Sequence, residues 1–436
     1  MTSLMPPLIL VRISAIGDTI LSARTQGLAR HKGYSPFLLT HESNASLLHC
    51  MPLLGGACLS SETGFKYLLQ TDLLKAMKEP EFSDVAKTSH TSQFTEVEQH
   101  IFFRALRSGL NVERKELSTS FNADPAHVPI VDLQATRRSR RVVRAFKEEL
   151  RKEQLATQTL TVAKLTLWRV ALVIWSFFAF KQRAHCTPPR WLQARLKPVR
   201  QLQKELMDRL PDQHPARSEH SLNQTRRPRV LQIVDEPQHR DHSHHAQGRI
   251  DEIPKIQRTQ HIVLLLGSSY KLKSWPQEHF RALTELILLR TNHTVVLCGG
   301  PNDARVAEFI AFPPNDRIIN RVGQTSLAET LRWIGRASYV VTGDSFASHA
   351  ADLLDTPASV LFGSTHPLLG FAPEGSHVTV HHSQLSCSPC NRHGQGECRF
   401  KNLKCLTSIK PEEVFLKIEQ SLERERQKSD TPLTGD

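Results

Sequence analysis

The second half of the chain alternates short apolar runs with segments of helical spacing, and this alternation restricts the fold more than any other feature. Strands are predicted at residues 262–266, 294–298, 339–341 and 359–362. Helices are predicted between and after them, at residues 276–289, 304–312, 326–334 and 411–424. Short apolar strands that alternate with helices indicate a parallel sheet that is covered on both faces.

The first half repeats this pattern less regularly. Apolar runs predict strands at residues 8–13, 37–39 and 129–133. Helical spacing predicts helices at residues 19–29, 96–107 and 137–151, the last of them strongly basic. We therefore expect an α/β protein with two Rossmann-like domains, whose parallel sheets face a central cleft and bind ligands at the carboxyl ends of their strands.

Composition sets the expected domain boundaries. Residues 188–248 are rich in Pro, Arg, Gln and His and have little apolar periodicity, which is typical of an interdomain segment. The predicted organisation is an N-terminal domain at residues 1–205, a His- and Arg-rich linker or insertion at 206–258, a second domain at 259–410, and a C-terminal helix and tail at 411–436.

Charge favours anionic partners, because Lys and Arg outnumber Asp and Glu by 56 to 43 and give a net charge of +13. Nucleic acid is not expected, since aromatic residues make up only 6% of the chain and no nucleic-acid module is recognisable. The N-terminus lacks the features of a secretory signal, which predicts a cytoplasmic protein. The most apolar run, residues 170–180, is shorter than the roughly 20 residues of a membrane-spanning helix. It is either an interfacial helix at the anionic inner face of the membrane or a core helix of the first domain.

Polar residues follow the first predicted strand of each half. Gly17 and Asp18 come after residues 8–13, where a carboxylate is either a general base or an ordinary helix N-cap. Lys273 lies in the loop after residues 262–266, beside the start of a helix, where it can neutralise phosphate charge.

A third segment of this kind follows residues 339–341. Gly343 closes the strand, and Asp344 and Ser345 open a helix whose free amides can bind diphosphate or be capped by these side chains. His349 lies one turn inside that helix, as a ligand contact or as a buried packing residue. Thr365 belongs to another turn from glycine to hydroxyl residues, which we expect to face the same crevice.

Four cysteines crowd toward the C-terminus: Cys387, Cys390, Cys398 and Cys405. One CxxC pair followed by two more thiols permits a structural zinc ion, with reduced thiols or a disulfide as the alternatives. No cofactor is expected to be required for the chemistry.

These segments, in this order, resemble glycosyltransferase family 9, the ADP-heptose:lipopolysaccharide heptosyltransferase family. The similar elements are residues 17–18, 132–139, 273–276, 299–301, 323–327, 344–349, 362–367 and 387–390. The resemblance implies a GT-B fold and an inverting transfer of a heptose or related sugar. The implied donor is ADP-linked, and the implied acceptor is the lipopolysaccharide core or a similar surface glycolipid.

The resemblance also implies roles for single residues. Asp18 matches the base that activates the acceptor hydroxyl, and Lys273 matches the lysine that contacts the donor diphosphate. The implied donor-binding residues are Gly17, Asp303, Gly343, Asp344, Ser345, His349 and Thr365. The implied acceptor-binding residues are Arg137, Arg138, Arg140 and Arg141, which alternatively form a solvated helix face.

One residue departs from the family pattern. Phe346 stands where the family usually has glycine, at the point where the backbone approaches the donor diphosphate, and its side chain takes up room there. The alternative expectation is therefore a catalytically impaired relative of the same fold that binds glycolipid or membrane.

Overall fold

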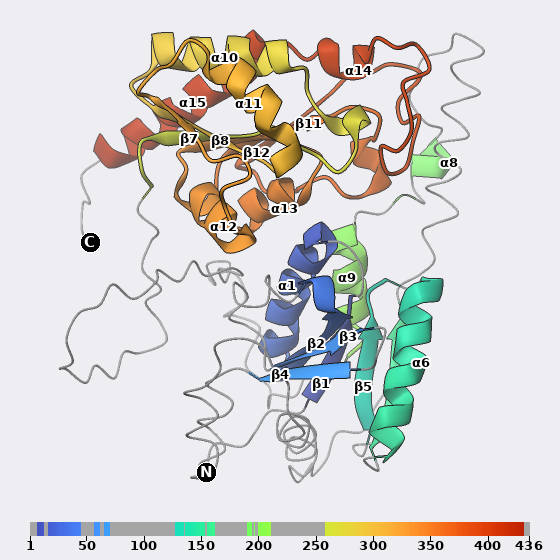
Figure 1. The fold of residues 1–436 in the computed structure, drawn as a ribbon. Coiled ribbons are helices and arrows are strands. Elements are labelled where there is room, and N and C mark those ends of the chain that lie inside the picture. Colours follow the sequence, from blue (N-terminus) through green and yellow to red (C-terminus); the bar gives the residue numbers. More distant parts are fainter. Residues whose placement is uncertain are drawn as a thin grey trace, which may run out of the picture. The chain divides into compact units, whose positions relative to one another are not determined.

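A computed structural model of the chain describes residues 7–12, 16–44, 56–61, 65–69, 127–134, 136–152, 155–161, 190–193, 196, 199–210 and 258–430. The described residues divide into two compact units (Figure 1). The first contains residues 7–161 and 199–210, and the second contains residues 190–196 and 258–430, within the described ranges. Most of the expected linker, the expected helix at 96–107 and the apolar run at 170–180 lie outside these ranges, so the domain boundaries stay a prediction.

The first unit is built on a six-stranded sheet in the order β4-β3-β2-β1-β5-β6. Its strands are β1 (Pro7–Val11), β2 (Ser35–His41), β3 (Gly56–Ser60), β4 (Phe65–Leu69), β5 (His127–Asp132) and β6 (Ala156–Thr161). Neighbouring strands are parallel except β3 and β4, which are antiparallel. Only residues 61–64 separate these two strands, and so short a connection permits a hairpin but not a parallel crossover.

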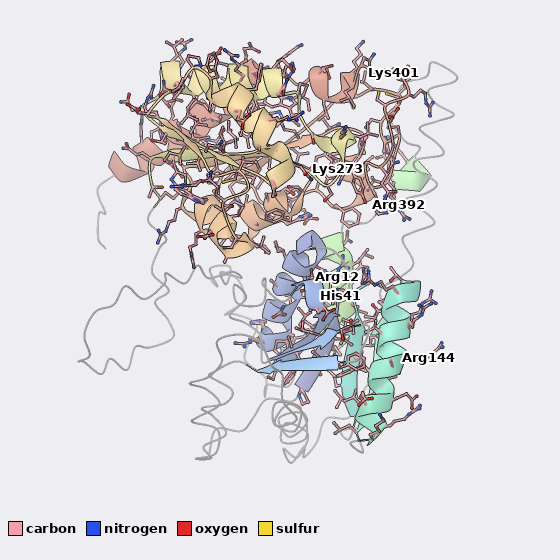
Figure 2. All side chains as sticks on the ribbon, in the orientation of Figure 1. Arg12, His41, Arg144, Lys273, Arg392 and Lys401 are labelled. Carbon is pink, nitrogen blue, oxygen red and sulfur yellow. The ribbon has the colours of Figure 1, made fainter. Side chains whose placement is uncertain are left out.

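Helices cover both faces of this sheet. Their bounds are α1 (Ile16–His31), α6 (Arg137–Lys152) and α9 (Val199–Met207), with the 3-10 turn η1 (Glu42–Asn44) after β2. Val143, Phe146 and Leu150 of α6 are buried against strand side chains that include Ile9 and Val11. The opposite face of α6 is exposed, and its Arg144 is labelled in Figure 2. Figure 1 shows α1 and α9 on the other side of the sheet.

The second unit also has a six-stranded sheet, all parallel, in the order β12-β11-β10-β7-β8-β9. Its strands are β7 (His261–Leu265), β8 (Thr294–Cys298), β9 (Ile318–Asn320), β10 (Tyr339–Gly343), β11 (Ala358–Phe362) and β12 (Val378–His382). Along the chain this is the Rossmann order 3-2-1-4-5-6, in which the direction of winding reverses between the first and fourth strands. Ligands of such sheets bind where the carboxyl ends of these two strands meet, which here are β7 and β10.

Helices lie on both faces of the second sheet as well (Figure 1). They are α10 (Gln277–Arg290), α11 (Ala304–Ala311), α12 (Leu327–Arg336), α13 (Phe346–Leu353) and α15 (Pro411–Asp430). Shorter elements are α8 (Arg190–Gln193), α14 (Lys404–Thr407), η3 (Lys271–Lys273), η4 (Pro301–Asp303) and η5 (Pro367–Leu369). Local sequence fixes several helix starts: Ser326 and Glu329 form a capping box at α12, with the Ser326 N–H donating to Glu329 Oε2 at 2.7 Å.

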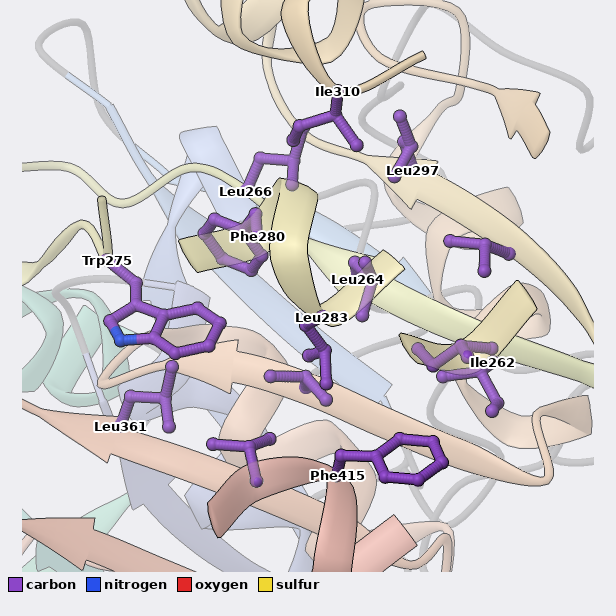
Figure 3. Close-up of a cluster of buried hydrophobic side chains, with 14 of the residues drawn as sticks. Ile262, Leu264, Leu266, Trp275, Phe280, Leu283, Leu297, Ile310, Leu361 and Phe415 are labelled. Carbon is purple, nitrogen blue, oxygen red and sulfur yellow. The ribbon is translucent and has the colours of Figure 1, made fainter. Parts of the chain in front are cut away.

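The main core of the second unit lies between the sheet and helices α10, α11 and α15 (Figure 3). Strand residues such as Ile262, Leu264 and Leu361 meet Phe280 and Leu283 of α10 there. The cluster also includes Phe415 of α15, so this closing helix completes the core rather than extending from it. Within the described ranges, no helix is both long enough and apolar enough to cross a membrane.

Candidate functional site

The loop that follows β7 carries Lys273, and buried residues on both sides fix its place. Leu272 and Trp275 are each only 4% exposed. The Trp275 ring packs edge-on against Phe280, with 5.1 Å between ring centroids, and its indole N–H donates to the Ile409 carbonyl at 3.2 Å. Figure 3 shows Trp275 within the core cluster. Lys273 is therefore held at the carboxyl edge of the sheet by its neighbours in sequence.

The Lys273 ammonium meets the turn that follows β10. It lies 2.8 Å from Asp344 Oδ2 and donates to the Asp344 carbonyl oxygen at 3.1 Å. Thr365, from the turn after β11, donates its hydroxyl to the same Oδ2 at 2.8 Å. The side chains of Lys273 and Asp344 are 16% and 10% exposed, so this is a partly buried ion pair. A lysine ammonium has three N–H donors, and no described residue engages the third.

The start of α13 settles which residue caps the helix. The Ser345 hydroxyl accepts from the Ala347 N–H at 3.3 Å, whereas Asp344 is turned to Lys273. Gly343 is required by close packing, because a Cβ there would lie 2.8 Å from the Lys273 carbonyl oxygen. His349 is buried inside the helix, and its donor-binding role stays a prediction.

Asp303 occupies the same edge of the sheet, after β8. Its Oδ2 accepts from the Gly300 N–H at 2.9 Å, which closes the turn that begins α11. The carboxylate packs on Gly267 and Gly299, where added Cβ atoms would lie 2.0 and 2.7 Å from Oδ2. Burial raises the pKa of Asp303, partly offset by the Gly300 hydrogen bond. These contacts give Asp303 a structural function, and the ribose contact implied by the family resemblance stays a prediction.

In the first unit, Gly17 and Asp18 follow β1. Helix α1 begins at Ile16, so both residues lie in its first turn. An N-cap residue would precede the helix, so Asp18 is not the N-cap. The side chain of Asp18 is outside the described part of the chain.

Arg12, which our sequence analysis did not single out, is buried beside this turn. It is 4% exposed and donates through Nη1 to the Leu133 carbonyl oxygen, after β5, at 2.7 Å. Asp132, at the end of β5, is 1% exposed and accepts from the Ser139 hydroxyl at 2.9 Å. An arginine directly after an apolar strand was the available signal for Arg12, because a guanidinium at that place must find partners.

The basic helix α6 divides by charge along its length. Arg138, Arg140, Arg141 and Arg144 are exposed in its first half, and the side chain of Arg137 is outside the described residues. The first turn contains no acidic residue, whereas Glu148 and Glu149 near the end pair with Arg151 and Lys152 at 2.7 and 2.9 Å. Within the described part of the chain, Arg138, Arg141 and Arg144 have no ion-pair partner. Because the start of a helix is its positive end, arginines gathered there favour an anionic ligand.

The four C-terminal cysteines are free thiols. Among the described residues, no group of three or more His, Cys, Asp or Glu side chains is arranged to hold a metal ion. Burial raises the pKa of Cys405 to about 12 and also raises the pKa of Cys387 and Cys390, whereas at Cys398 backbone hydrogen bonds outweigh burial and lower the pKa. These residues as described do not fit a zinc site, and zinc stays a prediction.

Comparison with known proteins shows which family this chain resembles. The model of glycosyltransferase family 9 (heptosyltransferase) matches residues 200–402, which include Lys273, Asp344 and Thr365. This part of the chain is therefore similar to glycosyltransferase family 9. The solved structure "E. coli heptosyltransferase WaaC with ADP" is similar with a TM-score of 0.50, at 15% identity over 95% of this chain and 99% of that one. The fold is therefore the GT-B type of the family 9 enzymes.

Curated relatives match over shorter stretches. Lipooligosaccharide heptosyltransferase 2 of Haemophilus influenzae is 34% identical over 99 residues, which are 22% of this chain and 28% of that protein. Lipopolysaccharide heptosyltransferase 1 of Pseudomonas aeruginosa is 26% identical over 175 residues, which are 37% and 48% of the two chains. The chain thus aligns with less than half the length of these relatives.

Proposed function

We propose that this chain is an inverting glycosyltransferase, which transfers a heptose or related sugar from an ADP-linked donor to the lipopolysaccharide core or a similar surface glycolipid. The observation that carries this proposal is the cluster of Lys273, Asp344 and Thr365, at the meeting point of β7 and β10, inside the family 9 segment. Sheets of this order bind nucleotides at that point, and the cluster supplies a cation for a diphosphate.

In the proposed reaction, Asp18 takes the proton from an acceptor hydroxyl, whose oxygen attacks the anomeric carbon of the donor sugar. The bond between that carbon and the phosphate oxygen breaks on the opposite face, so the configuration inverts and ADP leaves. Lys273 stabilises the negative charge that develops on the departing diphosphate through its unengaged N–H. Asp344 and Thr365 keep the ammonium in place.

The identities of donor and acceptor rest on the relatives. The solved structure of WaaC is a complex with ADP, and the curated relatives are lipopolysaccharide or lipooligosaccharide heptosyltransferases. We extend these ligands to this chain and assign the acceptor's phosphate or carboxylate groups to the exposed arginines of α6, since arginine pairs well with both groups. We also propose a cytoplasmic location with peripheral contact at the anionic inner face of the membrane.

A second candidate is a non-catalytic relative that binds glycolipid. The observation that favours it is Phe346, the first residue of α13, which puts an aromatic side chain where the family has glycine. The binding experiment described next distinguishes this candidate from the transferase.

Calorimetry with ADP and with ADP-heptose tests the proposal on three proteins: the wild type, Lys273→Ala and Lys271→Ala. Lys271 is the matched control, because it is an exposed lysine in the same 3-10 turn with no described ion pair. A charge-assisted hydrogen bond contributes about 1.5–3 kcal/mol, so Lys273→Ala is expected to weaken ADP binding by roughly tenfold or more, and Lys271→Ala by less than about twofold.

Equal affinities of the two variants would show that Lys273 does not contact the donor. Absence of saturable binding of ADP-heptose to the wild type would favour the non-catalytic relative. Melting temperatures of all three proteins show whether a loss of binding reflects a loss of folding.

A further inference from the structure

The segment of the second unit that contains the cysteines covers the side chain of Lys273. Gly394 packs against this side chain, since an added Cβ there would lie 2.7 Å from Lys273 Cγ and 3.0 Å from Cε. The backbone of Gly394 therefore touches the methylene chain of the lysine, whereas Asp344 holds its ammonium. Lys273 and Arg392, a neighbour of Gly394 in this loop, are both labelled in Figure 2.

One side chain gives this loop its shape. Asn391 Oδ1 accepts from the backbone N–H groups of His393, Gly394 and Gln395, at 2.8, 2.9 and 3.2 Å. Its amide group donates to the Gln395 carbonyl oxygen at 2.8 Å. Gly394 has a φ of +82°, which glycine adopts without strain. Asn391 thus holds the whole turn that presents Gly394 to Lys273.

The loop is attached to the site on two sides. Toward β11, the Cys390 N–H donates to the Ser364 carbonyl oxygen at 3.1 Å, and the buried Ser388 hydroxyl donates to the Gly363 carbonyl oxygen at 2.9 Å. Toward β7, the Gln395 amide donates to the Tyr270 hydroxyl at 3.0 Å. These bonds tie the loop both to the turn that carries Thr365 and to the residue before η3.

We propose that Asn391 and Gly394 are positioning residues for Lys273: they confine its methylene chain, so that the ammonium stays at Asp344 with one N–H available to the donor diphosphate. A lysine side chain has large rotamer freedom, and a cation that is ordered before binding loses less of it when the ligand arrives. The ligand named here rests on the proposed function, but the contact with the lysine does not.

Two glycines of the same loop provide a matched pair for the test. Gly394 and Gly396 have nearly the same left-handed backbone, with φ of +82° and +84°. A Cβ at Gly396 would meet no atom within 4 Å, whereas a Cβ at Gly394 would meet Lys273. Alanine therefore strains the backbone at both positions, but only Gly394→Ala displaces the lysine.

The first readout is independent of any ligand. Lysine acylation with a limiting reagent, followed by peptide mass spectrometry, reports how accessible the Lys273 amine is. We expect Gly394→Ala to raise the labelling rate of Lys273 at least threefold relative to Lys271 of the same protein, and Gly396→Ala to leave this ratio unchanged. The same rate ratio in both variants would overturn the proposal. If Gly394→Ala does not fold, Asn391→Ala replaces it, because that change loosens the turn without adding an atom near the lysine.

The second readout is ADP affinity by calorimetry. Gly394→Ala is expected to weaken ADP binding about tenfold and Gly396→Ala less than threefold, at equal melting temperatures. Loss of equal size in the two variants would mean that the contact between Gly394 and Lys273 does not determine ADP affinity, and would overturn the proposal. If Lys273→Ala itself binds ADP normally, the proposed function fails, while the labelling ratio still decides whether Asn391 and Gly394 position the lysine.

Discussion

Asp18 lies in the first turn of α1, where β1 leads into the helix at the carboxyl edge of the first sheet. The winding of this sheet reverses between β1 and β5, so the turn after β1 is where a ligand of the first unit is expected. The positive end of a helix also stabilises negative charge. Both features suit a carboxylate that accepts a proton from a bound hydroxyl.

Asp18→Asn should abolish transfer without abolishing donor binding, since general base catalysis contributes about 100-fold to 10,000-fold to a rate. We expect turnover to fall by at least about 100-fold, with ADP affinity and melting temperature close to those of the wild type. Transfer from ADP-heptose to a heptose-free core acceptor measures the rate. Asp208→Asn, at an exposed aspartate after α9 in the same unit, is the control and should keep full activity. Full activity of Asp18→Asn would remove this residue from the mechanism.

Among the elements, α6 carries its charges in an arrangement that opposes its own stability. Exposed arginines crowd the positive end of the helix, whereas the other end has acidic and basic residues in pairs. Cations at the start of a helix cost about 0.3–1 kcal/mol each at low ionic strength. The acidic acceptor that we propose for these arginines would offset this cost.

Neutralising Arg138 and Arg141 to Gln is therefore expected to raise the acceptor KM at least about tenfold, and to reduce its dependence on salt, while slightly raising the melting temperature. The matched control neutralises Arg151 and Lys152, two cations at the other end of α6, and should leave the acceptor KM unchanged. Initial rates at several salt concentrations, with calorimetric melting, provide the measurements. A lower melting temperature with unchanged KM would instead make the arginines part of an ordinary solvated face.

The elements also show how far sequence patterns reach. β8 has the predicted bounds, because an unbroken apolar run with polar flanks specifies a buried central strand. β6, β9 and β12 were not predicted: β9 has three half-exposed residues, and β6 and β12 include many polar ones, so their apolar signal is weak. The antiparallel β4 was also missed, because Lys66 interrupts its short apolar run.

Sequence also anticipated that the turns after β7, β10 and β11 lie together, since parallel strands end at one edge. It did not reveal the contact between Gly394 and Lys273, which joins distant parts of the chain through backbone packing. The two glycines of the 391–396 loop were the available hint, because glycines so close together in a polar loop often mark left-handed turns. The catalytic and binding roles of all these residues stay predictions.

At the scale of the whole molecule, the second unit contains histidines whose pKa is lowered chiefly by burial: His261, His293, His366, His377 and His381. The pKa of His366 and that of His381 fall to about 4. These side chains are neutral in the folded protein at pH values where the unfolded chain already binds protons. These buried histidines therefore leave the free energy of unfolding at its full value above about pH 6.5 and lower it as the pH falls toward 4.

Urea unfolding between pH 7 and pH 4 is expected to show a falling free energy of unfolding for the second unit. His381→Gln should flatten this fall by at most about 1.4 kcal/mol per pH unit, the linkage value for one proton. Gln384→Ala, at an exposed residue just after the same strand, is the control and should preserve the slope. An unchanged slope in His381→Gln would show that this histidine titrates alike in the folded and unfolded states.

The contact between Lys273 and Gly394 also bears on how the protein is made. The family motif around the lysine leaves the ribosome long before the glycine that touches it. Until residues 388–396 have been synthesised, the Gly394 backbone cannot pack against the Lys273 side chain. A nascent chain can thus form β7, β10 and their ion pair early, yet becomes able to hold its cation rigidly only at a late stage of translation.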